Sequence, residues 1–160
     1  MSKINTVFLF ISLFLLSTYS FGETISQLTD RRISLLEAAL APKTPQSVAI
    51  SWAKAAKNRN GAIQYMLMCP DLQQKYLSNL EALNWVTGIS SPWVSDFKIL
   101  SQRKNAKSWI FTIQYVLSTS GKSAGTDVDT ITVVRADTQS NSQQSFCISK
   151  FTYLSPVDGL

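Results

Sequence analysis

The sequence contains no histidine and only two cysteines, Cys69 and Cys147. Without an imidazole, the chain cannot form a Ser-His or Cys-His nucleophile pair, a histidine metal site or a histidine proton shuttle. Two cysteines are also too few for a zinc site made of cysteine alone. Charged residues are scarce, at 16% of the 160 residues, whereas hydrophobic residues make up 45%. This composition excludes a disordered chain and predicts one folded domain.

One long apolar run is present, at residues 7–16, and it follows the basic residue Lys3. The run has the length of a signal-peptide core and is too short to span a bilayer comfortably. Small residues precede Glu23, so we predict a signal peptide over residues 1–22, with an uncleaved membrane anchor as the alternative. Its removal takes one of the 15 basic residues and leaves 14 against 10 acidic ones, or +4 instead of +5. We expect an exported bacterial protein, periplasmic or secreted, without a stable membrane anchor after cleavage.

Export changes how the two cysteines are interpreted. In an oxidising compartment, a lone pair of cysteines forms a disulfide more often than a metal or redox site. We therefore predict a disulfide between Cys69 and Cys147. Two buried free thiols are the alternative, because sequence spacing does not show whether the sulfur atoms meet.

Two segments are expected after the signal peptide. Residues 23–43 have the apolar spacing of a helix that Pro42 ends, and we interpret them as an N-terminal helical arm. Thr44 and Pro45 come next, and a capping residue followed by proline is a typical helix start. We therefore place a single domain over residues 44–160.

This domain begins with helical periodicity and ends with strand periodicity. Three or four helices are expected before Trp93. From Val94 onward apolar residues alternate with polar ones, most clearly between Trp109 and Leu117. The breaks between four such strands are short enough for antiparallel hairpins. The order predicts an α+β domain in which helices cover one face of a four-stranded antiparallel sheet.

Three segments of the chain carry a family resemblance: residues 44–55, a helix start; residues 58–65, a break after that helix; and residues 85–94, a connector into the sheet. They resemble the corresponding segments of the nuclear-transport-factor-2-like, or cystatin-like, superfamily, in particular its exported bacterial members. The resemblance covers residues 44–154 and implies a cone, with helices packed into a curved four-stranded antiparallel sheet and a concave pocket. It implies no particular reaction, because the superfamily contains enzymes, binding domains and assembly modules.

Aromatic residues are the main candidates for a binding site at the mouth of such a cone. Indole and phenol rings bury apolar surface and offer a hydrogen-bond donor, which suits an apolar ligand with a few polar groups. Trp85 and Trp93 are the better candidates, because they flank a loop that contains Gly88 and Pro92. For each residue the alternative is that it fills the core. The candidate ligand- or partner-binding residues are Trp85, Trp93, Trp52, Tyr65, Trp109 and Tyr115.

Basic residues gather at two places. Arg103, Lys104 and Lys107 surround a predicted hairpin tip, and a second group lies at residues 54–59, at the end of a helix. We predict that the hairpin group forms a basic rim for an anionic lipid, a polysaccharide or an acidic partner surface. Solubilising charge is the alternative. Nucleic acid is not expected for an exported domain with a modest charge excess.

The carboxylates form no clear catalytic pair. Asp96 alternates with apolar neighbours, so it could face a pocket beside Tyr65 or Tyr115. The ketosteroid-isomerase branch of the resembled superfamily uses a pocket carboxylate as a base. Asp127 and Asp129 share one strand face, where we interpret them as a solvated edge, with weak cation binding as the alternative.

A serine nucleophile has no support. Ser51 and Lys54 match a Ser-x-x-Lys pattern, but the accompanying Ser-Asp-Asn and Lys-Thr-Gly elements are missing. We interpret this match as coincidence.

The sequence therefore favours an exported, non-catalytic binding or assembly domain that engages a protein partner or a small apolar ligand through the concave face of its sheet. No metal and no cofactor are expected. Two alternatives stay open: a small-pocket enzyme for proton transfer or hydrolysis that uses Asp96 and a tyrosine, and a secreted virulence or secretion-system component. Formation of a homodimer is also left open.

Overall fold

The computed structural model of the protein describes residues 29–120, 122–136 and 144–153. The predicted signal peptide lies outside the described residues. The chain divides into two units, residues 1–40 and 41–160, and the described part of the first unit is a helix over residues 29–40. Within the described ranges, no helix is both long and apolar enough to cross a membrane.

Local capping begins the helices of the second unit. Helix α2 spans Pro45–Lys57. The Ser47 backbone N–H donates to the Thr44 hydroxyl oxygen at 3.0 Å, and the Thr44 backbone N–H donates to the Ser47 hydroxyl oxygen at 3.0 Å. These reciprocal bonds satisfy two backbone donors at the start of the helix. Helices α3 (Gly61–Leu67) and α4 (Pro70–Ala82) follow.

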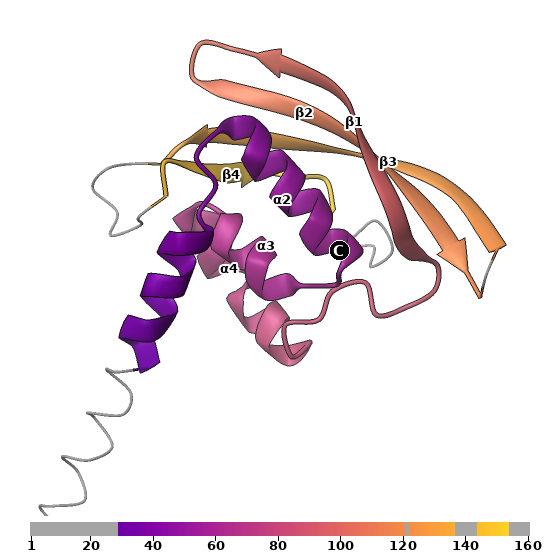
Figure 1. Cartoon of the computed structure of the whole chain (residues 1–160), viewed down its shortest axis with the longest axis horizontal. Coiled ribbons are helices and arrows are strands. Elements are labelled where there is room, and N and C mark those ends of the chain that lie inside the picture. The colour runs from indigo at the N-terminus through magenta and orange to yellow at the C-terminus, as the bar shows by residue number, and fades with distance from the viewer. Residues whose placement is uncertain (1–28, 121, 137–143, 154–160) are drawn as a thin grey trace, which may run out of the picture. The chain divides into compact units, whose positions relative to one another are not determined.

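Four strands follow the helices and form one antiparallel sheet (Figure 1). The strands are β1 (Trp93–Lys104), β2 (Ser108–Thr119), β3 (Lys122–Arg135) and β4 (Phe146–Lys150). They lie in the order β1-β2-β3-β4, so each strand pairs with the next one in the sequence. The predicted α+β class and four-stranded antiparallel sheet are therefore confirmed.

Helices α2, α3 and α4 lie on one face of the sheet, which we call the inner face (Figure 1). Phe111, Ile113 and Tyr115 occupy alternate positions of β2 and are buried there. Trp52 of α2 packs into the same core and is fully buried. Burying a large apolar side chain contributes about 1.5–3 kcal/mol. The middle of the inner face is therefore the hydrophobic core of the second unit.

A disulfide joins Cys69 to Cys147, with their Cα atoms 5.0 Å apart and 78 positions between them in the sequence. Cys69 lies at the start of α4 and Cys147 in β4. Beside the bond, the Cys69 backbone N–H donates to the carbonyl of Ile148 at 2.9 Å, and Met68 forms a bridge with the same residue. This segment covers part of the edge of β4, where backbone groups would otherwise be unpaired. The predicted disulfide is confirmed.

Candidate functional site

Two of the six aromatic candidates, Trp52 and Tyr115, lie in the core. Trp52 has no exposed surface and Tyr115 is 1% exposed. The Trp52 ring packs against Phe151, with 4.9 Å between the ring centroids. Neither residue reaches solvent, so both fill the core in this structure, which is the alternative role considered for them.

Tyr65 and Trp85 contact each other edge to face, with 5.3 Å between their ring centroids. Both are half-buried. Trp85 has a φ of 61°, a left-handed conformation that residues other than glycine rarely adopt. Its carbonyl accepts the N–H of Gly61 at 2.8 Å, and a Cβ atom on Gly61 would lie 2.9 Å from that oxygen. The missing side chain at Gly61 therefore allows the backbone contact that positions Trp85.

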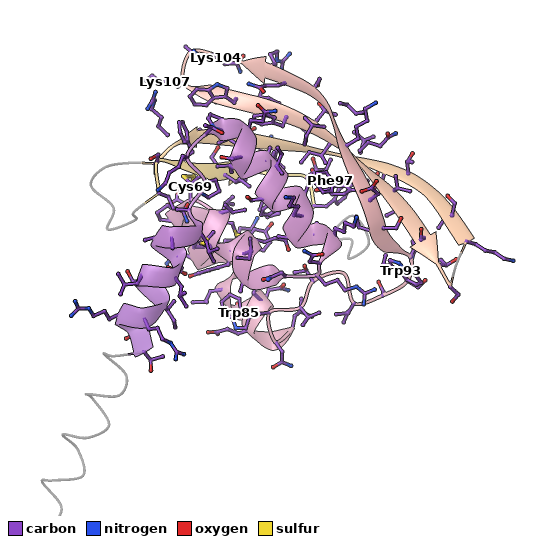
Figure 2. The ribbon with its side chains drawn as sticks, in the orientation of Figure 1. Cys69, Trp85, Trp93, Phe97, Lys104 and Lys107 are labelled. Carbon is purple, nitrogen blue, oxygen red and sulfur yellow. A yellow bond between two sulfur atoms is a disulfide. The ribbon has the colours of Figure 1, made fainter. Side chains whose placement is uncertain are left out.

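Trp93 is the first residue of β1 and lies opposite Ser118 of β2. It is half-buried. Figure 2 shows Trp85 and Trp93 at separate places on the second unit. These two tryptophans flank the same connector in the sequence, but the structure does not bring them into one site.

The hairpin between β1 and β2 carries two members of the predicted basic rim, Lys104 and Lys107 (Figure 2). Both lie beside Trp109, the second residue of β2. Lys104 lies opposite Trp109 in the strand register, and its Nζ atom is 5.8 Å from the centroid of the Trp109 ring. Beside this ring is a hollow of about 460 Å³ that is open to solvent. Its lining residues are Ala106, Lys107, Trp109, Val134 and Arg135. We call it the Trp109 hollow.

Contacts between cations and aromatic rings hold the side chains around this hollow. Trp109 contacts Phe146 of β4 edge to face, with 5.4 Å between the ring centroids. Arg135 lies opposite Phe146 in the register, and its guanidinium carbon is 5.4 Å from the centroid of that ring. A cation over an aromatic face contributes about 0.5–1 kcal/mol at an exposed site. Lys104 and Arg135 therefore each restrain one ring of the Trp109–Phe146 pair.

The Trp109 hollow is positively charged. Lys104, Lys107 and Arg135 are exposed, and no carboxylate of the described residues pairs with any of the three. Within that part of the chain, the ion pair joins the Nζ atom of Lys57 to the Oδ1 atom of Asp96 at 3.3 Å. An anionic group that enters the hollow would therefore meet cations whose charge no described carboxylate offsets.

The basic rim differs in membership from the sequence prediction. Arg103 is one position from Lys104 along β1, so it points to the opposite face of the sheet from Trp109. Arg135 lines the hollow instead, and sequence reasoning did not single it out. Arg135 follows Val133 by two positions in β3, and Val133 is buried on the inner face. The period-two pattern of the strand was therefore the signal that could have placed Arg135 on the same face as Trp109.

Asp96, the carboxylate considered for catalysis, is exposed on β1. Its side chain is 70% exposed and pairs with Lys57. A hydrogen bond from the Phe97 backbone, together with Lys57, holds the pKa of Asp96 below its ordinary value. The enzyme hypothesis requires this carboxylate to face Tyr65 or Tyr115 inside a pocket. The exposed position of Asp96 removes the geometric basis for that arrangement.

Asp129 is buried, which corrects its interpretation as part of a solvated strand edge. It is 1% exposed, and its Oδ1 atom accepts the backbone N–H of Thr152 at 3.0 Å. Burial raises the pKa of Asp129 above its ordinary value. Burial, with the nearby charge of Asp129, also raises the pKa of Tyr115. Asp127 does share a face with Asp129, but it is only half-buried.

A second hollow, of about 180 Å³, lies at the end of α2. It contains both members of the Ser-x-x-Lys match but no carboxylate, and its lining residues are Ser51, Lys54, Ala55, Asn58, Asn60 and Ile63. Across the described ranges, no three Cys, Asp or Glu side chains gather closely enough to hold a metal ion. The Trp109 hollow is therefore the site with the more specific chemistry.

No family model matches the chain, and no curated protein or solved structure matches it. Function is therefore inferred from the residues and contacts of this chain alone.

Proposed function

We propose that the protein is an exported, non-catalytic binding domain of the nuclear-transport-factor-2-like class, which binds an acidic segment of a partner protein in the Trp109 hollow. The observation that carries this proposal is the half-buried Trp109 ring with Lys104, Lys107 and Arg135 around it. An aromatic ring and three cations suit binding better than catalysis, because the lining includes no carboxylate or thiol that could act as a base or nucleophile.

The fold supports the assignment to this class. Three helices lie on one face of a four-stranded antiparallel meander, which is the arrangement that the resemblance implies (Figure 1). The middle of the inner face is filled by side chains such as Trp52 and Phe111. Trp109 belongs to the same face at its hairpin end, where the hollow is open. Ligand access to the inner face is therefore proposed at this end.

Export is supported by the predicted signal peptide and by the disulfide. Disulfides form and persist in oxidising compartments outside the cytosol. The Cys69–Cys147 bond is consistent with such a compartment. The partner is therefore proposed to be another protein outside the cytosol.

The shape of the hollow favours a protein segment over a small apolar ligand. Small-molecule sites bury about 70–90% of the ligand surface. The Trp109 hollow is open, and the cations that line it are exposed, so a small apolar molecule would keep much of its surface in water. A peptide segment can place one apolar side chain on Trp109 and extend beyond the hollow in both directions.

Charge explains why that segment should be acidic. Carboxylates beside the apolar side chain can pair with Lys107 and Arg135, and arginine accepts a carboxylate in a two-bond geometry. Such complementary charge speeds association and selects the partner more than it adds raw affinity. Binding through exposed charges also weakens with salt, because ions screen them over about 10 Å at 0.1 M.

The test is a titration of the mature, disulfide-bonded chain with a short peptide of alternating Glu and Leu residues, followed by calorimetry at low and at physiological salt. We expect binding that weakens with salt and falls at least tenfold in Trp109→Ala, since the substitution removes the apolar contact. A peptide with Gln in place of Glu should bind at least tenfold more weakly than the Glu peptide.

The matched control is Lys122→Ala, which removes an exposed lysine at the start of β3, far along the strand from Arg135. Lys107→Ala should weaken binding whereas Lys122→Ala should not. Equal binding of the Gln and Glu peptides, or equal loss in the two lysine variants, would contradict the proposal. Binding of a neutral apolar dye at Trp109, without binding of the Glu peptide, would favour the small-ligand alternative.

A further inference from the structure

The helix over residues 29–40, drawn in indigo in Figure 1, presents large apolar side chains to solvent. These side chains, which are 46–60% exposed, are Ile33, Leu35, Leu36 and Leu40. None of the four belongs to the hydrophobic core that the described residues form. A helix of this length is only marginally stable in water by itself, because most helical stability in proteins comes from the packing of an apolar face. A partner that covers these side chains would therefore stabilise the helix.

Three of the four side chains lie on one line along the helix. Ile33, Leu36 and Leu40 are separated by three and then four positions. This is the spacing of positions a and d in the seven-residue repeat abcdefg, along which two helices wind around each other as a coiled coil. Ile33 then occupies position a and Leu36 position d, a combination that favours two parallel helices. Leu35 falls at position c, outside this seam.

Opposite charges flank the seam. Arg32 occupies position g and Glu37 position e. They lie five positions apart, whereas side chains that pair within one helix lie three or four apart. Among the described residues, neither one has an ion-pair partner. In a parallel coiled coil, a residue at g of one helix pairs with the residue at e five positions later in the other helix. Two copies of the helix would therefore form two Arg32–Glu37 pairs, one on each side of the seam.

The same charges disfavour an antiparallel pair of helices. In that orientation, residues at e face residues at e, and residues at g face residues at g. Asp30 and Glu37 both occupy position e, so acidic side chains would face each other. Arg32 would face the other g residue, Ala39, and would gain no carboxylate. Facing like charges weaken association, so the charge pattern selects the parallel orientation.

We propose that the helix over residues 29–40 is a homodimerisation surface, which forms a parallel two-stranded coiled coil with the same helix of a second copy of this chain. The seam is short, with three apolar positions in each helix, and small interfaces are typical of weak association. We expect a dissociation constant of about 10–500 µM. This inference does not depend on the function proposed for the Trp109 hollow.

The test is sedimentation velocity of the mature, disulfide-bonded chain at protein concentrations from about 5 µM to about 1 mM, a span that includes the expected dissociation constant. The average mass should rise with concentration from that of one chain toward that of two. A chain that stays monomeric at every concentration would overturn the proposal. So would a mass that continues to rise beyond that of a dimer.

The matched variants are Leu36→Ala and Leu35→Ala, which shorten neighbouring leucines of similar exposure. Alanine and leucine are both strong helix formers, so neither change disfavours the helix itself. Leu36→Ala should raise the dissociation constant at least tenfold, because it removes both leucines of one seam layer. Leu35→Ala should leave the constant nearly unchanged. Equal effects of the two substitutions would contradict the seam, and would favour a membrane surface that contacts exposed leucines without such a register.

Charge reversal tests the parallel orientation. Arg32→Glu should weaken association about tenfold, because it brings two acidic side chains together on each side of the seam. The double variant Arg32→Glu/Glu37→Arg should recover the wild-type dissociation constant, since the pairs form again with their signs exchanged. An unchanged dimer in Arg32→Glu, or a double variant no better than Arg32→Glu alone, would contradict a parallel pair of these helices.

Discussion

At the scale of single residues, the buried carboxyl of Asp129 makes the free energy of unfolding depend on pH. A group whose pKa is raised on folding stabilises the folded state fully below its unfolded pKa, and this contribution is lost as pH rises through the folded pKa. Asp129 is of this kind, because burial raises its pKa. Asp96 is of the opposite kind, since its lowered pKa adds stability only above the unfolded value. Asp96 is exposed, however, so solvent screens its contribution.

The substitution Asp129→Asn should therefore change the pH dependence of stability. Urea unfolding of the wild-type chain and of the variant, compared between pH 4 and pH 8, measures this. The wild-type chain should lose stability relative to the variant as pH rises, by up to about tenfold in the unfolding equilibrium constant per pH unit. A difference between the two chains that stays constant across this range would show that Asp129 does not titrate in the window that its burial implies.

At the scale of elements, a helix cap and a disulfide hold the helices in place. Thr44 and Ser47 close the start of α2 by reciprocal hydrogen bonds of 3.0 Å. The Cys69–Cys147 disulfide fixes the junction between α3 and α4 to the edge strand β4. The first device acts within four residues, and the second joins parts of the chain that are distant in sequence. Their removal should therefore differ in energetic cost.

Replacement of the capping residue, Thr44→Ala, should lower the free energy of unfolding by about 1 kcal/mol, because it removes the acceptor for the Ser47 N–H. Urea denaturation gives this value from the shift of the midpoint at constant slope. The matched control is Thr119→Ala at the half-buried last position of β2, which lies outside any helix start. An equal loss in both variants would argue against the cap.

Removal of the disulfide should cost more. The double substitution of Cys69 and Cys147 by Ser should lower the free energy of unfolding by about 2–5 kcal/mol, because the unfolded chain gains the freedom of a loop that closes over 78 positions. Urea denaturation of the double variant, and of the reduced wild-type chain, measures the loss. The two forms should agree, and a loss below that of Thr44→Ala would contradict a structural role for the bond.

At the scale of the whole molecule, one hydrophobic core organises the second unit. Its buried members run from Val48 of α2 to Ile148 of β4 and come from every helix and strand of that unit. Each helix therefore depends on the sheet for the burial of its apolar face. The described part of the first unit, the helix over residues 29–40, contributes no member to this core.

A chain that begins at Ala41 should consequently fold on its own. Its thermal unfolding should be a single cooperative transition, within a few degrees of the transition of the chain that begins at Glu23. Near-ultraviolet circular dichroism would report whether the aromatic packing around Trp52 is retained. Loss of the cooperative transition on truncation would show that residues 23–40 are part of the folding unit.

Much of the fold could be predicted from the sequence, because several of the patterns that indicate helices and strands lie within short stretches of residues. The Thr44–Pro45 start of α2 and the period-two run that includes Trp109 each predicted an element that the structure confirms. The basic hairpin tip was also visible, since Lys104 and Lys107 lie a few residues apart. The sequence showed that Asp127 and Asp129 share a strand face, but the interpretation of that face as a solvated edge was wrong for Asp129. The segment that contacts Asp129 comes from residues 151–153, which are distant in sequence.

Composition and periodicity alone determined the α+β class and the four-stranded meander, because each depends on neighbours in sequence or on residue type. They offered Cys69 and Cys147 as the two candidate partners of a disulfide, and the tertiary structure decided that they meet. Tertiary structure decided which side chains meet. Strand register placed Lys104 over Trp109 and Arg135 over Phe146, and the path of the chain after β4 buried Asp129. Such contacts depend on register and on chain crossings between distant segments, and no local pattern of residues encodes either one.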